Sequence, residues 1–154
     1  MGEADRRRGA PAAGRRPGAP GGSDSAEAGG VSSGPGRVLV AVYALFALAA
    51  GARAGVQLAT RFGEAPVAYS LSAFAALVYL VLTVALIRGA RRTALVACLI
   101  ELAGVLVVGT VSVFVPEMFP RATVWSGYGS GYVYIPLVLP VLGLFWLFRR
   151  RTAR

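Results

Sequence analysis

The sequence contains no histidine, no lysine and no asparagine, and Cys98 is its single cysteine. The lack of histidine excludes imidazole acid–base catalysis and most zinc sites. The lone cysteine excludes an intrachain disulfide and a CxxC redox pair. Charged residues make up only 15% of the 154 residues, where about a quarter is usual in a soluble domain. This low share of charged residues, with 56% hydrophobic residues, favours a membrane protein.

The charge that is present comes mostly from arginine, with 16 arginines against 7 acidic residues and a net charge of +9. A strongly basic chain can indicate nucleic-acid binding. Here the arginines flank apolar runs and form no basic stripe with interleaved aromatic residues, so we expect no nucleic-acid partner. Arginine used without lysine or asparagine is typical of a G/C-rich genome.

Residues 1–36 form a low-complexity stretch of glycine, proline, alanine, serine and arginine. Such a composition buries too little apolar surface to offset the loss of chain entropy on folding. We therefore expect a disordered cytoplasmic tail over residues 1–36, followed by a membrane domain over residues 37–151.

Four apolar runs follow this tail. A helix needs about 20 residues to cross roughly 30 Å of hydrocarbon, and the runs have or approach that length. They cover about residues 38–59, 67–87, 93–115 and 132–148. The last run is short and contains Pro136 and Pro140, so we expect a kinked or tilted helix. The sequence predicts an all-α fold, a bundle of four transmembrane helices.

The arginines also predict the orientation of the spans, because short cytoplasmic segments carry an excess of positive charge. With four spans, 13 of the 16 arginines fall on one side of the membrane. The other side receives Arg53, Arg61 and Arg121. We therefore predict a multi-pass protein of the cell membrane with both termini in the cytoplasm.

Residues at helical spacing predict which faces point into the bundle. The predicted inward faces are Tyr43, Phe46, Ala50, Arg53 and Gln57; Tyr69, Ser72, Ala76, Tyr79 and Thr83; and Ala94, Ala97, Cys98, Glu101, Gly104, Val108 and Ser112. Gly51 and Gly55 form a Gly-x-x-x-Gly step, which permits close helix packing but also arises by chance in a glycine-rich chain. With Gly104, they are our predicted helix-packing positions.

Glu101 is the one acidic residue that falls well within a predicted span. It follows Arg92 by nine residues, which places it about 14 Å along the helix, near the middle of the membrane. Tyr79 is predicted at the same depth as its partner, whereas Arg53 is roughly 10 Å too far toward the outer side for easy pairing. These three residues form the candidate intramembrane polar site, with a structural role and a proton-coupling role both open.

The segment between the third and fourth runs is rich in aromatic residues and glycine. Trp125, Tyr128 and Tyr132 match the aromatic belt that lies at membrane interfaces. Interleaved glycines indicate a turn-rich loop, which is also where a partner would dock. Interface belt and partner-docking loop are therefore alternative hypotheses for these residues.

The stretches "MFPRATVWSGYGSGYVYIPLVLPVLGLFWLFRR" and "VAYSLSAFAALVYLVLTVALIRG" resemble small four-span integral membrane proteins of high-GC actinobacteria. The likeness covers about residues 38–151 and excludes the tail. The resemblance implies the fold and the membrane location. It implies no activity and no residue role, because that family has no assigned function.

Two functions remain open. The leading hypothesis is a non-enzymatic accessory or scaffold subunit of a cell-envelope complex, which binds a membrane-protein partner or a second copy of the chain. The alternative is a minimal proton-coupled transporter that uses Glu101. In size and in its single membrane acid it resembles the four-helix small multidrug exporters, but their acid lies in the first helix. No catalytic residue, cofactor or metal ligand is predicted.

Overall fold

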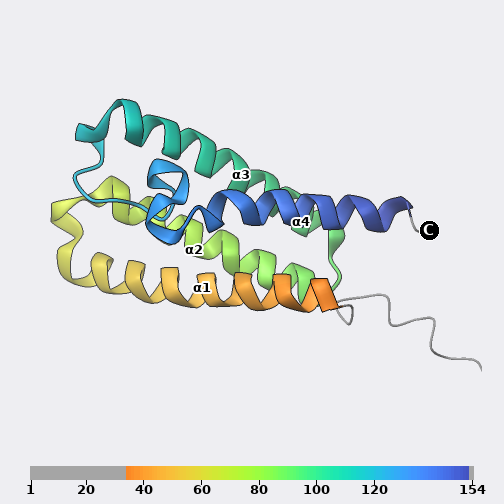
Figure 1. Cartoon of the computed structure of the whole chain (residues 1–154). Helices are drawn as coiled ribbons and strands as arrows, with labels where there is room; N and C mark the ends of the chain where they lie inside the picture. Colours follow the sequence, from red (N-terminus) through yellow and green to blue (C-terminus); the bar gives the residue numbers. More distant parts are fainter. Residues whose placement is uncertain (1–33, 153–154) are drawn as a thin grey trace, which may run out of the picture.

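The computed structural model describes residues 34–152, and their fold is all-α, as predicted (Figure 1). The long helices are α1 (Gly34–Arg61), α2 (Pro66–Ile87), α3 (Arg91–Phe114) and α4 (Ile135–Thr152). Short 3-10 helices lie in the connections: η1 (Phe62–Glu64), η2 (Pro116–Met118) and η3 (Ser126–Tyr132). The predicted disordered tail lies outside the described residues, apart from its last three positions.

Those three positions correct the predicted start of the membrane domain. α1 already begins at Gly34, so residues 34–36 are helical and do not belong to a tail. Pro35 is compatible with this start because proline is tolerated in the first turn of a helix, where its missing N–H has no carbonyl to bond.

The four long helices run side by side (Figure 1). α1 packs mainly on α2, and α3 contacts both α2 and α4. The start of α1, the α2–α3 connection and the end of α4 share one end of the bundle. Arg37, Arg88 and Arg92 lie there, so we call it the arginine-rich end. The three 3-10 helices lie at the opposite end, which we call the loop end.

Three helices, α1 to α3, are long and apolar enough to cross a membrane. η3 and α4 pass the same test together, but they are bent by 98°. The described part of the chain is therefore a multi-span membrane protein with three spans, or four if the bent pair counts as one. Large apolar side chains such as Leu48 and Phe145 point outward and imply contact with the lipid bilayer.

The fourth predicted helix begins later than expected. The sequence predicts a span from Tyr132, but α4 starts at Ile135. Val133 and Tyr134 interrupt the helix because both adopt left-handed backbone angles, with φ of 55° and 59°. Such angles are unfavourable for side-chain-bearing residues, above all for a β-branched valine. They produce the sharp bend between η3 and α4.

The inward faces agree largely with the prediction. All five predicted residues of α2 are buried, and so are Tyr43, Phe46 and Ala50 on α1. Further along α1 the agreement ends, because Arg53 is exposed and Ala54 takes the inward position. The bundle interior thus combines small residues and tyrosines with aliphatic side chains such as Leu82 and Val105.

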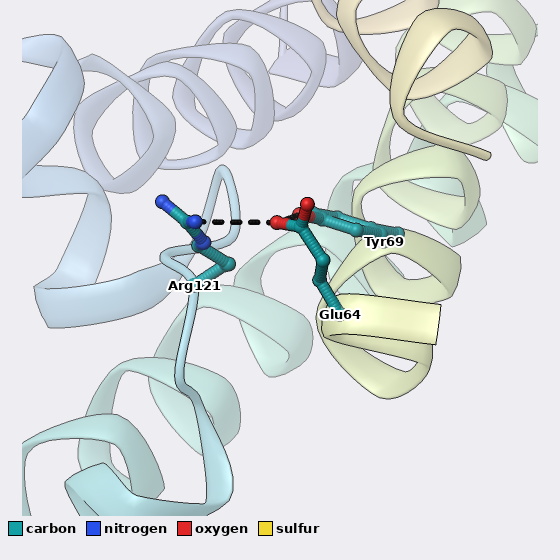
Figure 2. Close-up of polar contacts among 3 residues, drawn as sticks. All are labelled: Glu64, Tyr69 and Arg121. Atoms are coloured by element: carbon teal, nitrogen blue, oxygen red, sulfur yellow. Dashed lines mark hydrogen bonds and ion pairs between the residues drawn. The ribbon is translucent and has the colours of Figure 1, made fainter. Parts of the chain in front are cut away.

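An ion pair joins the two connections at the loop end (Figure 2). Arg121, between η2 and η3, lies 3.2 Å from the Glu64 carboxylate of η1. The Tyr69 hydroxyl donates a long 3.4 Å hydrogen bond to the same carboxylate oxygen. This contact ties the α1–α2 connection to the segment that follows α3.

Candidate functional site

Glu101 is the centre of the candidate site. It lies near the middle of α3 and has no exposed surface. The hydroxyl of Tyr43 on α1 donates a 2.9 Å hydrogen bond to its Oε2 atom. Its other oxygen, Oε1, is buried and has no partner within the part of the chain that the structure describes. A polar atom in this state requires an explanation, because nearly all buried polar groups are hydrogen-bonded.

All four long helices contribute to the surroundings of this carboxyl. The Tyr43 ring packs against Tyr79 of α2, with 6.2 Å between ring centroids. The Tyr43 hydroxyl also lies 4.0 Å from the Cys98 sulfur on α3. From α4, Gly143 approaches so closely that an added Cβ would lie 3.0 Å from that sulfur. We call Tyr43, Tyr79, Cys98 and Glu101 the carboxyl cluster.

The partner predicted for Glu101 is wrong. The sequence predicts Tyr79, but the bond comes from Tyr43, whereas the Tyr79 hydroxyl accepts a 3.1 Å hydrogen bond from the Trp125 indole. The Tyr79 oxygen is held toward Trp125, which enters the bundle from the loop end, while the Tyr43 hydroxyl of α1 lies within hydrogen-bond distance of Glu101. Tyr79 remains in the cluster through its ring contact.

Arg53 does not join this cluster. Its guanidinium is exposed and its Nη1 atom donates a 2.7 Å hydrogen bond to the Tyr132 hydroxyl. This placement agrees with the helical count, which puts Arg53 too far along α1 to pair easily with Glu101. Of the predicted intramembrane polar site, the structure therefore brings together Glu101 and Tyr79 and leaves Arg53 apart.

Trp125 is placed where neither hypothesis for the aromatic loop predicts it. It is only 1% exposed, so it is neither a surface docking residue nor an interface anchor. Its ring fills the space beside Gly104, where an added Cβ would lie 2.5 Å from the indole. The sequence predicts Gly104 as a helix-packing position, whereas in the structure it accommodates Trp125 of the loop.

Tyr128 and Tyr132 also fold back onto the helices, and both are half-buried. Tyr128 covers Gly109, and its hydroxyl lies 3.0 Å from the Thr110 hydroxyl. Tyr132 contacts the Phe46 ring at 5.8 Å, in addition to its bond with Arg53. We call residues 123–134 the folded-back segment.

Local hydrogen bonds shape this segment. The Thr123 hydroxyl accepts bonds from the backbone N–H groups of Trp125 and Ser126, which forms a tight turn. The Gly127 N–H donates to the Ser112 hydroxyl at the end of α3. Gly127 and Gly129 both have positive φ, which glycine adopts without strain. The glycines that predict a turn-rich loop therefore allow the turns that fold it against the bundle.

An aromatic layer separates the carboxyl cluster from the loop end. The Phe46 ring packs against the rings of Tyr79 and Tyr132, with 5.7 Å and 5.8 Å between ring centroids. Trp125 completes the layer beside Gly104, one helical turn beyond Glu101 on α3. Glu101 is therefore closed off from the loop end.

Beyond this layer lies a cavity of about 290 Å³, between α1 and the folded-back segment. Its polar lining residues are Arg53, Ser112, Thr123, Ser126, Ser130 and Tyr132. Arg53 is the one charged residue among all the residues that line it. No motif in the sequence indicated this cavity, because it forms only when the loop folds back.

Gly51 and Gly55, both predicted as helix-packing positions, have different surroundings in the structure. A Cβ added at Gly51 would lie 4.0 Å from the Ala76 Cβ of α2, which is an ordinary van der Waals contact. Gly55 is exposed, and a Cβ added there would meet nothing within 4 Å. The Gly-x-x-x-Gly step is therefore not used for close packing within the described bundle.

No protein-family model matches this sequence, and neither a curated protein nor a solved structure matches it. The resemblance to four-span actinobacterial proteins thus gains no support from a match. The class that the fold itself defines is a small multi-span membrane protein with a buried carboxyl cluster.

Proposed function

We propose that this membrane protein is a non-enzymatic, minimal proton-coupled transporter in which Glu101 binds the proton or a small cation. The observation that carries the proposal is the buried carboxyl where the four helices meet, one oxygen of which has no hydrogen-bond partner among residues 34–152. An ionisable residue inside a membrane is expensive and is a functional candidate by default.

The state of the two carboxyl oxygens supports this role over a structural one. A structural acid is expected to have both oxygens hydrogen-bonded, because an unsatisfied buried polar atom costs about 1–3 kcal/mol. Here Tyr43 satisfies one oxygen and the other is left for a proton or a cation. Binding of either would neutralise the carboxylate, which removes the cost of a buried charge.

The surroundings of Glu101 correspond to an occluded arrangement. The aromatic layer closes the side toward the loop end. Toward the arginine-rich end, the Arg91 side chain of α3 donates bonds to the Leu147 carbonyl of α4, which holds these helices together. Transport would require two steps. In one, the hydrogen bond from Trp125 to Tyr79 breaks and opens Glu101 toward the loop end. In the other, the bonds between Arg91 and Leu147 break and open it toward the arginine-rich end.

Proton flux tests this proposal. The full chain is reconstituted into phosphatidylcholine vesicles with a pH-sensitive dye inside, and a potassium gradient with valinomycin drives protons inward. We expect faster acidification than in protein-free vesicles and loss of that excess in Glu101→Gln. Glu117→Gln, an exposed acid in η2, is the matched control and should behave as the wild type. Wild-type flux at the protein-free rate, or full flux in Glu101→Gln, contradicts the proposal.

We also propose that the arginine-rich end faces the cytoplasm of the cell that makes the protein, which places both termini inside. The support is the positive-inside rule applied to the arginines at that end. In a Cys98→Ala background, Gly89→Cys should resist a membrane-impermeant maleimide in intact cells, while Gly63→Cys should react. The reverse pattern contradicts this orientation.

The accessory or scaffold role is the second candidate, and the open face of α1 favours it. Gly55 leaves room there for a neighbouring helix from a partner or a second copy. The loop no longer supports docking through Trp125, because that side chain is buried. Gly55→Leu should then abolish recovery of a stoichiometric partner in mild detergent without lowering the membrane level of the protein. Unchanged recovery would remove this candidate.

A further inference from the structure

The cavity at the loop end offers hydrogen-bond donors that have no acceptor in the described part of the chain. Arg53 uses one N–H on the neutral Tyr132 hydroxyl, and most of its donors remain available. Because Tyr132 accepts that bond, its own O–H proton is free to donate into the cavity. Ser130 also lines the cavity, and among the described residues its hydroxyl has no hydrogen-bond partner.

The other hydroxyls of the lining are already engaged. Ser112 accepts from the Gly127 N–H and donates to the Gly109 carbonyl. Thr123 and Ser126 bond to each other and to the backbone of their own turn. The donors left over therefore come from Arg53, Ser130 and Tyr132, which lie around the same space.

No acid neutralises Arg53 within the part of the chain that the structure describes. Glu64, on the α1–α2 connection, is paired with Arg121. Glu117 lies on η2 and does not line the cavity. The lining thus combines one positive charge with free donors, which is the chemistry that selects an oxyanion.

We propose that the cavity bounded by Arg53, Ser130 and Tyr132 binds the phosphate group of an anionic ligand. A guanidinium presents two parallel N–H groups that match two phosphate oxygens. The hydroxyls of Ser130 and Tyr132 would donate hydrogen bonds to the remaining phosphate oxygens. The proposal is independent of Glu101, because the aromatic layer separates the two sites.

The phosphate can come from two sources, a phospholipid headgroup or a soluble phosphate. Arg53 precedes the end of α1 by eight residues, about 12 Å, and from there its long side chain can extend toward the headgroup region. A second hollow of about 470 Å³ along α1 is lined by Arg53 together with Arg61. A lipid headgroup would use both arginines, whereas a soluble phosphate in the cavity would use Arg53 with Ser130.

Thermal unfolding of the full chain in a neutral detergent tests the site. The probes are inorganic phosphate against chloride at equal ionic strength, and dioleoylphosphatidylglycerol against dioleoylphosphatidylcholine. At about ten times the Kd, a bound ligand should raise the Tm by about 4 °C. This rise should vanish in Arg53→Gln and persist in Arg121→Gln, which removes the same charge from the same end of the bundle.

The remaining variants distinguish the sources. If inorganic phosphate raises the Tm and Ser130→Ala weakens the effect, the ligand is a soluble phosphate. If only the anionic lipid raises the Tm and Arg61→Gln weakens the effect, the ligand is a headgroup. Both results support the site. Absence of a shift with either probe, or an undiminished shift in Arg53→Gln, overturns it.

Discussion

The indole of Trp125 donates a 3.1 Å hydrogen bond to the hydroxyl of Tyr79, a residue 46 positions earlier in the chain. Both side chains are buried, so a loop residue reaches the interior of the bundle at α2. This contact closes the aromatic layer over Glu101. It lies between the occluded carboxyl of Glu101 and the cavity at the loop end.

We predict that Trp125 is a major contributor to stability. Trp125→Ala should lower the free energy of unfolding by about 3 kcal/mol, because it empties the space beside Gly104. Tyr79→Phe removes only the hydrogen bond and should cost about 0.6 kcal/mol, as is typical within membranes. Reversible unfolding in mixed micelles, followed by circular dichroism, measures both. Phe148→Ala, which truncates an exposed ring, serves as the control. If it lowered the free energy of unfolding as much as Trp125→Ala does, the prediction would be contradicted.

Glycine substitutions should separate the two packing positions. Gly104→Ala forces a Cβ to within 2.5 Å of the Trp125 ring and should destabilise the fold by about 1–3 kcal/mol. Gly55→Ala meets no neighbour and should be neutral or slightly stabilising, because alanine favours helices. The same unfolding assay applies. Equal effects at both positions would show that Trp125 does not occupy this space.

The pairing of Glu101 with Tyr43 predicts an energetic coupling between them. Tyr43→Phe leaves both carboxyl oxygens without a donor and should cost about 1–3 kcal/mol. In a Glu101→Leu background, which has no acceptor for the Tyr43 hydroxyl, the same change should cost clearly less. A double-mutant cycle measures the difference. A larger coupling between Tyr79 and Glu101 would instead restore the partner predicted from the sequence.

The ion pair between Glu64 and Arg121 should contribute little. The two side chains are 44% and 57% exposed, and such surface pairs are worth about 0.2–1 kcal/mol. Arg121→Gln should therefore destabilise the protein slightly at low salt, with no effect at high salt because of screening. A large or salt-independent loss would mean that this contact is part of the structural core.

Much of the fold could be predicted from the sequence, because lipid imposes helices of a given length and helical periodicity fixes their faces. The spans predicted at 38–59, 67–87 and 93–115 lie close to α1, α2 and α3. Burial of Glu101 followed from its position within an apolar run.

The details of the site could not be predicted from the same patterns. Helical counting gives the depth and the face of a residue, but not which helix turns toward it, so Tyr43 was missed as the partner of Glu101. Nor does composition distinguish a loop that projects outward from one that folds back. The left-handed residues that turn the chain, Val133 and Tyr134, are of types that ordinarily avoid such angles.

Whether Glu101 binds protons is tested most directly with dicyclohexylcarbodiimide, a lipid-soluble reagent that modifies carboxyl groups after they are protonated. Modification is located by mass spectrometry of the full chain in vesicles, and proton flux is measured in parallel. If Glu101 binds protons and its surroundings open, it should be labelled, and flux should fall as labelling proceeds. A purely structural carboxyl beneath Trp125 would stay unlabelled, or its labelling would leave proton flux unchanged. Either result would contradict a role of Glu101 in proton transport.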